Sequence, residues 1–103
     1  MANELKVETG TASTLGSVIA TVPAGATWTI IGLRIANKAS QDCHISVQVN
    51  GTYVSGAQTP LPQHTAIDIM VGSKIVAKAG HEVVVTSCSD NVADVYISYL
   101  EQT

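Results

Sequence analysis

The sequence predicts an all-β fold, an antiparallel β-sandwich or jelly roll of seven to eight short strands. Apolar and polar residues alternate along most of the chain, and no segment keeps the spacing of an amphipathic helix. Turn signals recur about every ten residues, as in two-sheet sandwiches. With 103 residues, the chain is long enough for one domain and too short for two domains with separate cores.

Residues 1–16 are predicted to form an N-terminal arm outside a single sandwich domain of residues 17–103. Leu5 and Val7 make an apolar stripe of two positions, followed by the polar, glycine-containing segment TGTASTLGS. So short a stripe does not offset the cost of ordering the backbone, about 1–2 kcal/mol per residue. We expect the arm to add to the sheet of a neighbouring subunit; the alternative is an edge strand within its own domain.

The next two strands are separated by a Pro-Ala-Gly turn. Alternate apolar residues from Val18 to Val22 share one face of the first. In the second, alternate residues from Ile31 to Ile35 share a face, whereas Trp28 and Ile30 have the opposite phase. This change of phase predicts a bulge near Gly32, or a strand that is covered on both sides.

The segment ISVQVNGTYV predicts a β-hairpin. Ile45, Val47 and Val49 alternate with polar residues, and Asn50-Gly51 supplies the two positive φ angles that a type I′ turn requires.

The rest of the chain predicts a surface loop followed by further strands. The loop is SGAQTPLPQH, with two prolines among polar residues. Strands follow at Ile67 to Val71 and Lys74 to Ala77. The alternating segments Val83 to Val85 and Val95 to Tyr99 predict a final antiparallel pair around the turn at Cys88 to Asn91.

The cysteines and histidines do not form a metal-binding pattern. Cys43 and Cys88 are isolated, and in a reducing cytosol we expect two free thiols at strand ends, with a disulfide as the alternative. His44, His64 and His81 belong to separate segments, so we expect ordinary surface histidines and no metal site.

Composition argues against nucleic-acid and membrane partners. The net charge is −3, and the five basic residues form no stripe along the chain. No signal peptide or transmembrane run is expected, which indicates synthesis in a cytosol-like compartment. Charged residues make up 13%, against about a quarter in typical domains, so the surface favours packing against other proteins.

No pattern of catalytic residues stands out. The acidic residues occur singly, no GxSxG motif is present, and no glycine-rich phosphate loop is found. We therefore expect a protein that is not an enzyme and has no cofactor.

Two pairs of segments carry a resemblance. VPAG followed by TWTIIGLRIANK, and KIVAKAGHEVVV followed by VADVYISYLE, resemble a family of small β-sandwich proteins encoded by tailed bacteriophages. His81 stands where the family has an acidic residue, which is displaced to Glu82. The matching residues are Val22 to Gly25, Asn37, Ala79-Gly80 and Tyr99 to Glu101.

The resemblance implies a virion structural protein without catalytic residues. We expect a capsid decoration (cement) protein, made in the host cytoplasm, that contacts its own copies and a major virion protein such as the capsid protein. The alternative is a tail, neck or fibre component with a host-glycan-binding surface.

Five residues are candidates for partner binding. Leu5 and Val7 belong to the arm, and Trp28 is a large anchor at a strand start. Arg34, the sole arginine, is either a solvated residue or an interface hot spot. Tyr53 follows the Asn-Gly turn and is the expected exposed ring for stacking on a sugar.

Overall fold

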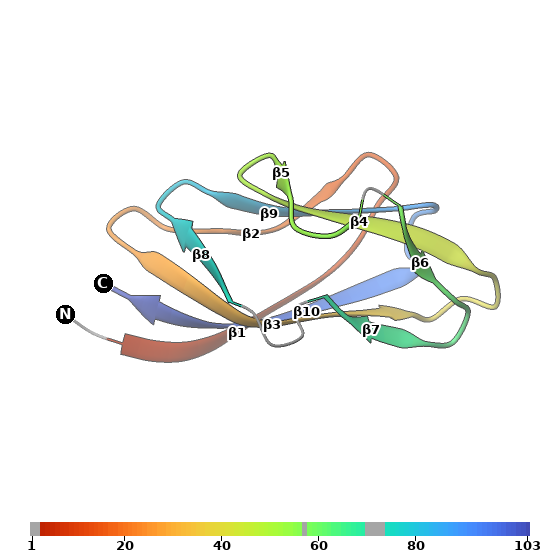
Figure 1. Ribbon diagram of the computed structural model, residues 1–103, viewed down its shortest axis with the longest axis horizontal. Helices are drawn as coiled ribbons and strands as arrows, with labels where there is room; N and C mark the ends of the chain where they lie inside the picture. Colours follow the sequence, from red (N-terminus) through yellow and green to blue (C-terminus); the bar gives the residue numbers. More distant parts are fainter. Residues whose placement is uncertain (1–2, 57, 70–73) are drawn as a thin grey trace.

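The computed structural model, which describes residues 3–56, 58–69 and 74–103, contains two antiparallel sheets packed face to face (Figure 1). The first sheet has the order β1, β10, β3, with β7 and β8 both paired to the far edge of β3. Its strands are β1 (Asn3–Thr11), β3 (Thr27–Asn37), β7 (Ala66–Asp68), β8 (Ile75–Lys78) and β10 (Ala93–Gln102).

The second sheet has the order β2, β9, β4, β5, with β6 also paired to β4. Its strands are β2 (Ser17–Thr21), β4 (Cys43–Val49), β5 (Thr52–Tyr53), β6 (Thr59–Leu61) and β9 (Glu82–Ser87). The predicted antiparallel β-sandwich is confirmed. The structure divides the described residues into ten strands rather than seven or eight, because several strands have only two to four residues.

The core lies between the sheets, and along most of the longer strands buried residues alternate with more exposed ones. On β4, Ile45 and Val47 are fully buried, and on β10, in the other sheet, Val95 and Ile97 are buried as well. Within the described residues, no helix is long and apolar enough to cross a membrane.

A β-bulge interrupts β3 where the phase change predicted one. The register with β10 shifts so that Tyr99 pairs with Ile30 while Ser98 pairs with Gly32. The bulge lets Ile30 and Leu33 both point into the core, and Ile31 is left 43% exposed. The prediction that Ile31 shares a face with Leu33 and Ile35 was therefore wrong.

The hairpin turn at Asn50-Gly51 is confirmed. The two residues have φ of 53° and 75°, and Val49 pairs with Thr52 directly across the turn. The segment that follows is more than a surface loop, because it contains β6 and buries Leu61 completely. Val71 of the strand predicted next lies outside the described residues.

The last two strands do not form the predicted pair. β9 pairs with β2 and β4 in the second sheet, whereas β10 pairs with β1 and β3 in the first. The turn that follows Cys88 therefore carries the chain from one layer to the other. Alternation fits a strand of either layer equally well, so it does not identify the pairing partner.

Cys43 and Cys88 form a disulfide, which corrects the expectation of free thiols. Cys43 begins β4 and Cys88 follows the last residue of β9, and these two strands are direct neighbours. The bond therefore ties together the ends of two paired strands in the second sheet.

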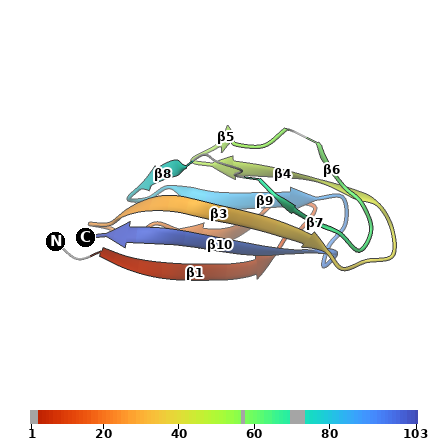
Figure 2. The ribbon, with the colours of Figure 1, turned by 60° about the horizontal axis from the view of Figure 1, so that its bottom comes forward.

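The N-terminal segment is not an arm outside the domain, at least from Asn3 onward. Residues Asn3 to Thr11 pair with β10 along nine positions, from Asn3 opposite Gln102 to Thr11 opposite Asp94. Figure 2 shows β1 at the outer edge of the first sheet, beside β10. The structure agrees with the alternative prediction, an edge strand within its own domain. Met1 and Ala2 lie outside the described residues.

Candidate protein-interaction surface

The outer face of the first sheet carries a row of side chains across four strands. On β10, Val95 and Ile97 are buried, so Tyr96 between them points outward. The pairing register places Thr9 of β1 on one side of Tyr96 and Arg34 of β3 on the other. Asp68 of β7 lies opposite Arg34 and completes the row. We call the outward side chains of β1, β10, β3, β7 and β8 the outer face.

The outer face collects most of the exposed large apolar side chains. Of eight such side chains among the described residues, five belong to it. These are Leu5, Val7, Ile31, Val76 and Tyr96, with Leu5 76% and Tyr96 50% exposed. A gathering of exposed apolar groups on one face is typical of a binding surface, whereas single exposed apolar residues are ordinary.

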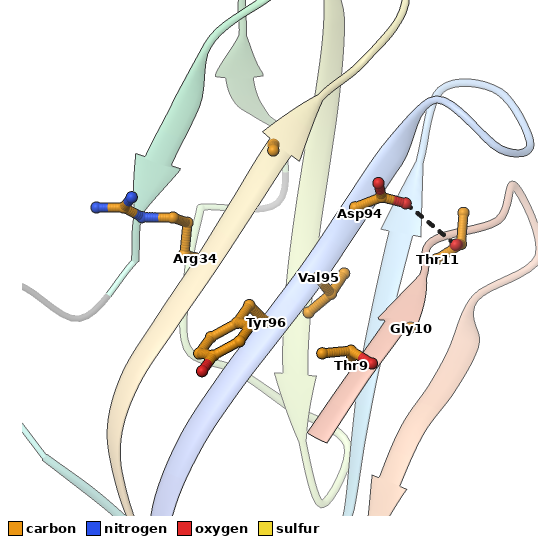
Figure 3. A pocket seen from close by; sticks show the side chains of 8 residues that line it. Thr9, Gly10, Thr11, Arg34, Asp94, Val95 and Tyr96 are labelled. Atoms are coloured by element: carbon orange, nitrogen blue, oxygen red, sulfur yellow. Dashed lines mark hydrogen bonds between the residues drawn. The ribbon is translucent and has the colours of Figure 1, made fainter. Parts of the chain in front are cut away.

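Two shallow hollows lie beside Tyr96. One, of about 390 Å³, is lined by residues that include Thr9, Gly10 and Asp94. The other, of about 420 Å³, is lined by residues that include Gly32 and Ser98. Figure 3 shows the tyrosine ring standing on β10 between Arg34 and Thr9. The hollows form because small side chains surround the large tyrosine ring. Side chains of a partner protein can fit into them.

Two acidic side chains on this face, Asp68 and Asp94, are paired with basic side chains. Arg34 donates two hydrogen bonds to Asp68, at 2.9 and 3.3 Å. The bonded guanidinium holds the pKa of Asp68 below its usual range. Asp94 accepts a hydrogen bond from Thr11 at 3.2 Å and lies 3.0 Å from the ammonium of Lys38. A carboxylate that is already paired loses less solvation energy when a partner covers it than a free carboxylate does.

The inward side of β1 contributes to a partly buried polar cluster. Trp28 and Tyr99 stack with ring centroids 3.8 Å apart. The Glu101 carboxylate beside them is nearly buried and accepts hydrogen bonds from the Trp28 indole N–H at 2.8 Å and the Lys6 ammonium at 2.7 Å. The Tyr99 hydroxyl donates to Glu8 at 3.1 Å. β1 therefore supplies the cation and one of the carboxylates that satisfy this cluster.

The Lys6–Glu101 pair makes stability depend on pH. The hydrogen bonds from Lys6 and then Trp28 hold the pKa of Glu101 below its ordinary value of 4.5. A carboxyl group with a lowered folded-state pKa stabilises the fold above its unfolded pKa, and this contribution is lost as the pH falls through the folded pKa. We expect the thermal midpoint to fall as the pH is lowered from about 5, measured by circular dichroism.

Two variants test whether Glu101 is the group responsible for this pH dependence of stability. Glu101→Gln keeps an acceptor for the Trp28 N–H and removes the titration, so its midpoint should change less with pH in the acid range. Asp68→Asn is the matched control: the pKa of Asp68 is also lowered, but this pair is exposed to solvent and contributes little. An acid profile of Glu101→Gln as steep as that of the wild type would contradict the assignment.

The five residues predicted for partner binding lie in three different places. Leu5, Val7 and Arg34 come together on the outer face. Trp28 is buried, 3% exposed, and anchors the core instead of an interface. Tyr53 is exposed on β5, in the second sheet.

Sequence reasoning missed Tyr96 as an exposed aromatic residue of the outer face. The signal was present, since Tyr96 has the opposite phase to the core residues Val95, Ile97 and Tyr99 of the same strand. A tyrosine on the polar phase of a buried strand is a candidate for exposure.

Within the described ranges, no three His, Cys, Asp or Glu side chains come close enough together to hold a metal ion. His81 instead accepts a hydrogen bond from the Lys78 N–H through Nδ1, at 3.1 Å, across the turn between β8 and β9. No protein-family model, curated protein or solved structure matches this chain.

Proposed function

We propose that this protein is a structural component of a larger protein assembly and docks onto it through the outer face of the first sheet. The assembly that we propose is a bacteriophage virion, in which the protein acts as a capsid decoration protein beside its own copies. The proposal includes no catalytic step and no cofactor.

The observation that carries the proposal is the concentration of exposed apolar side chains on the outer face, which also carries Tyr96. Tyrosine and arginine are the residue types most enriched at the energetic centres of interfaces, and Tyr96 and Arg34 are cross-strand neighbours here. The hollows beside the ring and the paired charges favour a protein surface as the ligand. The phage assignment rests on the resemblance of the turn and strand segments.

The disulfide is a second, independent support. Disulfides persist in oxidising surroundings and are rare in cytosolic proteins. A protein that is made in the cytoplasm and works in a released particle meets such surroundings after release, so the Cys43–Cys88 bond fits a virion better than a cytosolic role.

A tail, neck or fibre component that binds host glycans is the second candidate. The favouring observation is again Tyr96, because an exposed ring beside a hollow with some polar side chains, here Thr9 and Asp94, is the kind of site that stacks on a sugar. Tyr96 replaces Tyr53 as the residue to test for this function.

The experiment combines detection of the protein in particles with substitution of the outer face. Mass spectrometry should find the protein in purified phage particles. Tyr96→Ala and Arg34→Ala should each weaken binding to particles that lack the protein at least about tenfold, as loss of a hot-spot side chain does. Their thermal midpoints should stay close to that of the wild type, because both side chains are exposed.

Tyr53→Ala is the matched control, since Tyr53 is equally exposed but belongs to the second sheet. Its binding to particles should be unchanged. Absence of the protein from particles would refute the virion proposal, and unchanged binding of both outer-face variants would refute the docking face. A glycan array signal that Tyr96→Ala abolishes would favour the second candidate.

A further inference from the structure

The free edge of β1 differs from every other sheet edge that the structure describes. β5, β6, β7 and β8 have two to four residues each. β2 has five residues and a bulge at Ile19, which disturbs its edge. β1 has nine residues and pairs with β10 without any register shift. A long, regular edge is the kind that can accept another strand, whereas short or bulged edges resist it.

The backbone of β1 presents its free hydrogen-bonding groups at known positions. The Ala12 N–H, one residue beyond the strand in the same register, donates to the Ala93 carbonyl at 2.9 Å. In an antiparallel ladder the bonded pairs alternate, so the even-numbered residues of β1 bond to β10. The odd-numbered residues, including Leu5, Val7 and Thr9, therefore turn their N–H and C=O groups toward the free side.

We propose that two copies of the protein pair antiparallel along β1, around a two-fold axis through Val7. Val7 is the centre of the nine-residue strand, so this axis pairs the strand along its whole length, with Leu5 opposite Thr9 of the second copy. Each odd-numbered residue then meets an odd-numbered residue and exchanges backbone hydrogen bonds with it. The two first sheets become one continuous sheet.

The charges of β1 select this register. Glu4, Lys6 and Glu8 lie on the inward phase of the strand, opposite Glu101, Tyr99 and Ile97 of β10. An axis through Val7 places Lys6 of each copy opposite Glu8 of the other, two opposite-charge pairs. An axis through Lys6 would place the two lysines opposite each other and Glu4 opposite Glu8, which is unfavourable.

An axis through Leu5 also joins opposite charges, Glu4 with Lys6, but leaves the second half of the strand unpaired. The register centred on Val7 therefore combines matched charges with full overlap. On the outer face the same register sets Val7 against Val7 and covers part of the exposed surface of Leu5.

This inference deepens the proposed function, on which it rests for the idea that the protein contacts its own copies. The dimer joins two outer faces edge to edge and leaves Tyr96, Arg34 and Asp68 of both copies open. A dimer could then present two docking faces to one assembly, which raises its effective affinity when both engage together.

Single cysteines test the register directly. In the proposed dimer, position 7 is the position opposite itself, with Cα atoms about 5.5 Å apart, within the range of a disulfide. Val7→Cys should cross-link to itself under mild oxidation with copper phenanthroline, read by non-reducing gel electrophoresis and peptide mapping. Leu5→Cys alone should not cross-link to itself, because the two cysteines at position 5 of the dimer would lie about 14 Å apart along the strands.

A mixture of Leu5→Cys and Thr9→Cys proteins should form the mixed cross-link, since these positions oppose each other. Self-linking of Leu5→Cys without self-linking of Val7→Cys would overturn the proposed register in favour of the axis through Leu5. No enrichment of either predicted cross-link over an exposed cysteine in the second sheet, Tyr53→Cys, would overturn pairing along β1.

Proline substitution tests the hydrogen bonding. Val7→Pro removes an N–H that faces the free side, so it should leave the monomer folded and raise the dimer dissociation constant at least tenfold in sedimentation equilibrium. Glu8→Pro is the matched control, because its N–H bonds to β10 and its loss should lower the thermal midpoint of the monomer. A wild-type protein that stays monomeric up to millimolar concentration would overturn the proposal.

These readouts are separate from those of the proposed function. Cross-linking and sedimentation use the purified protein alone, whereas docking is measured on particles with Tyr96→Ala and Arg34→Ala. A dimer that binds no particle would refute the proposed function and leave the pairing intact. A protein that stays monomeric and still binds particles would refute the pairing and leave the proposed function intact.

Discussion

Removal of the Cys43–Cys88 disulfide should lower the free energy of unfolding by about 4 kcal/mol. The two cysteines are 45 residues apart in the sequence, so the bond restricts a large part of the unfolded chain. The chain-entropy relation for a loop of this length gives the stated value. This would be a substantial fraction of the 5–15 kcal/mol typical of a whole domain.

The measurement is urea unfolding of the wild type and of Cys43→Ala/Cys88→Ala, followed by circular dichroism. The double variant should unfold at lower urea, with a steeper dependence on urea because its unfolded chain is more expanded. Wild-type protein in reducing agent should behave like the double variant, which separates loss of the bond from loss of the sulfur atoms. A decrease below about 1 kcal/mol in both experiments would contradict the prediction.

Features that depend on neighbouring residues could be predicted from the sequence. The Asn50-Gly51 turn follows from two residues that accept positive φ between two alternating segments. The bulge at Gly32 follows from the change of apolar phase in β3. The alternation that runs through the chain was sufficient for the sandwich class, because it requires each strand to have one buried face.

Features that depend on distant partners could not be predicted in the same way. Val83 to Val85 and Val95 to Tyr99 have the same alternation, yet they belong to different sheets. Whether Cys43 approaches Cys88 depends on β4 lying beside β9, a pairing that spacing does not encode. The outer face likewise appears only when the register sets Tyr96 between Thr9 and Arg34.

The error about residues 1–16 has a specific physical cause. The estimate from Leu5 and Val7 counted apolar side chains, but both lie on the exposed outer face and contribute little to the monomer's core. The contribution of β1 comes instead from its ladder with β10 and from its inward side chains. Gly10 is one of these positions: a Cβ there would lie 2.9 Å from the Ile19 side chain, so its absence lets β1 pack close to β2.

Deletion of residues 1–11 should lower the free energy of unfolding by more than about 3 kcal/mol, comparable to truncating a core aromatic residue. The deletion removes a nine-residue ladder, uncovers the Tyr99 side of the core and takes away the cation of the nearly buried Glu101 carboxylate. The measurement is thermal and urea unfolding of the deletion variant. The full-length protein in this comparison should carry Val7→Pro, so that loss of dimerisation does not enter the measured difference.

Point variants separate the parts of β1 that matter. Leu5→Ser changes an outward side chain and should leave the monomer's midpoint nearly unchanged. Lys6→Met keeps the length of the stem but leaves the Glu101 carboxylate without its cation, so its midpoint should fall. Adding Glu101→Gln to Lys6→Met should recover part of the loss, because the remaining amide is neutral and still accepts from the Trp28 N–H. If the deletion left the midpoint unchanged, residues 3–11 would contribute nothing to the stability of the monomer, which would contradict this account of β1. A fall on deletion, together with recovery in the double variant, would assign to β1 both an edge of the sandwich and the charge that satisfies its buried carboxylate.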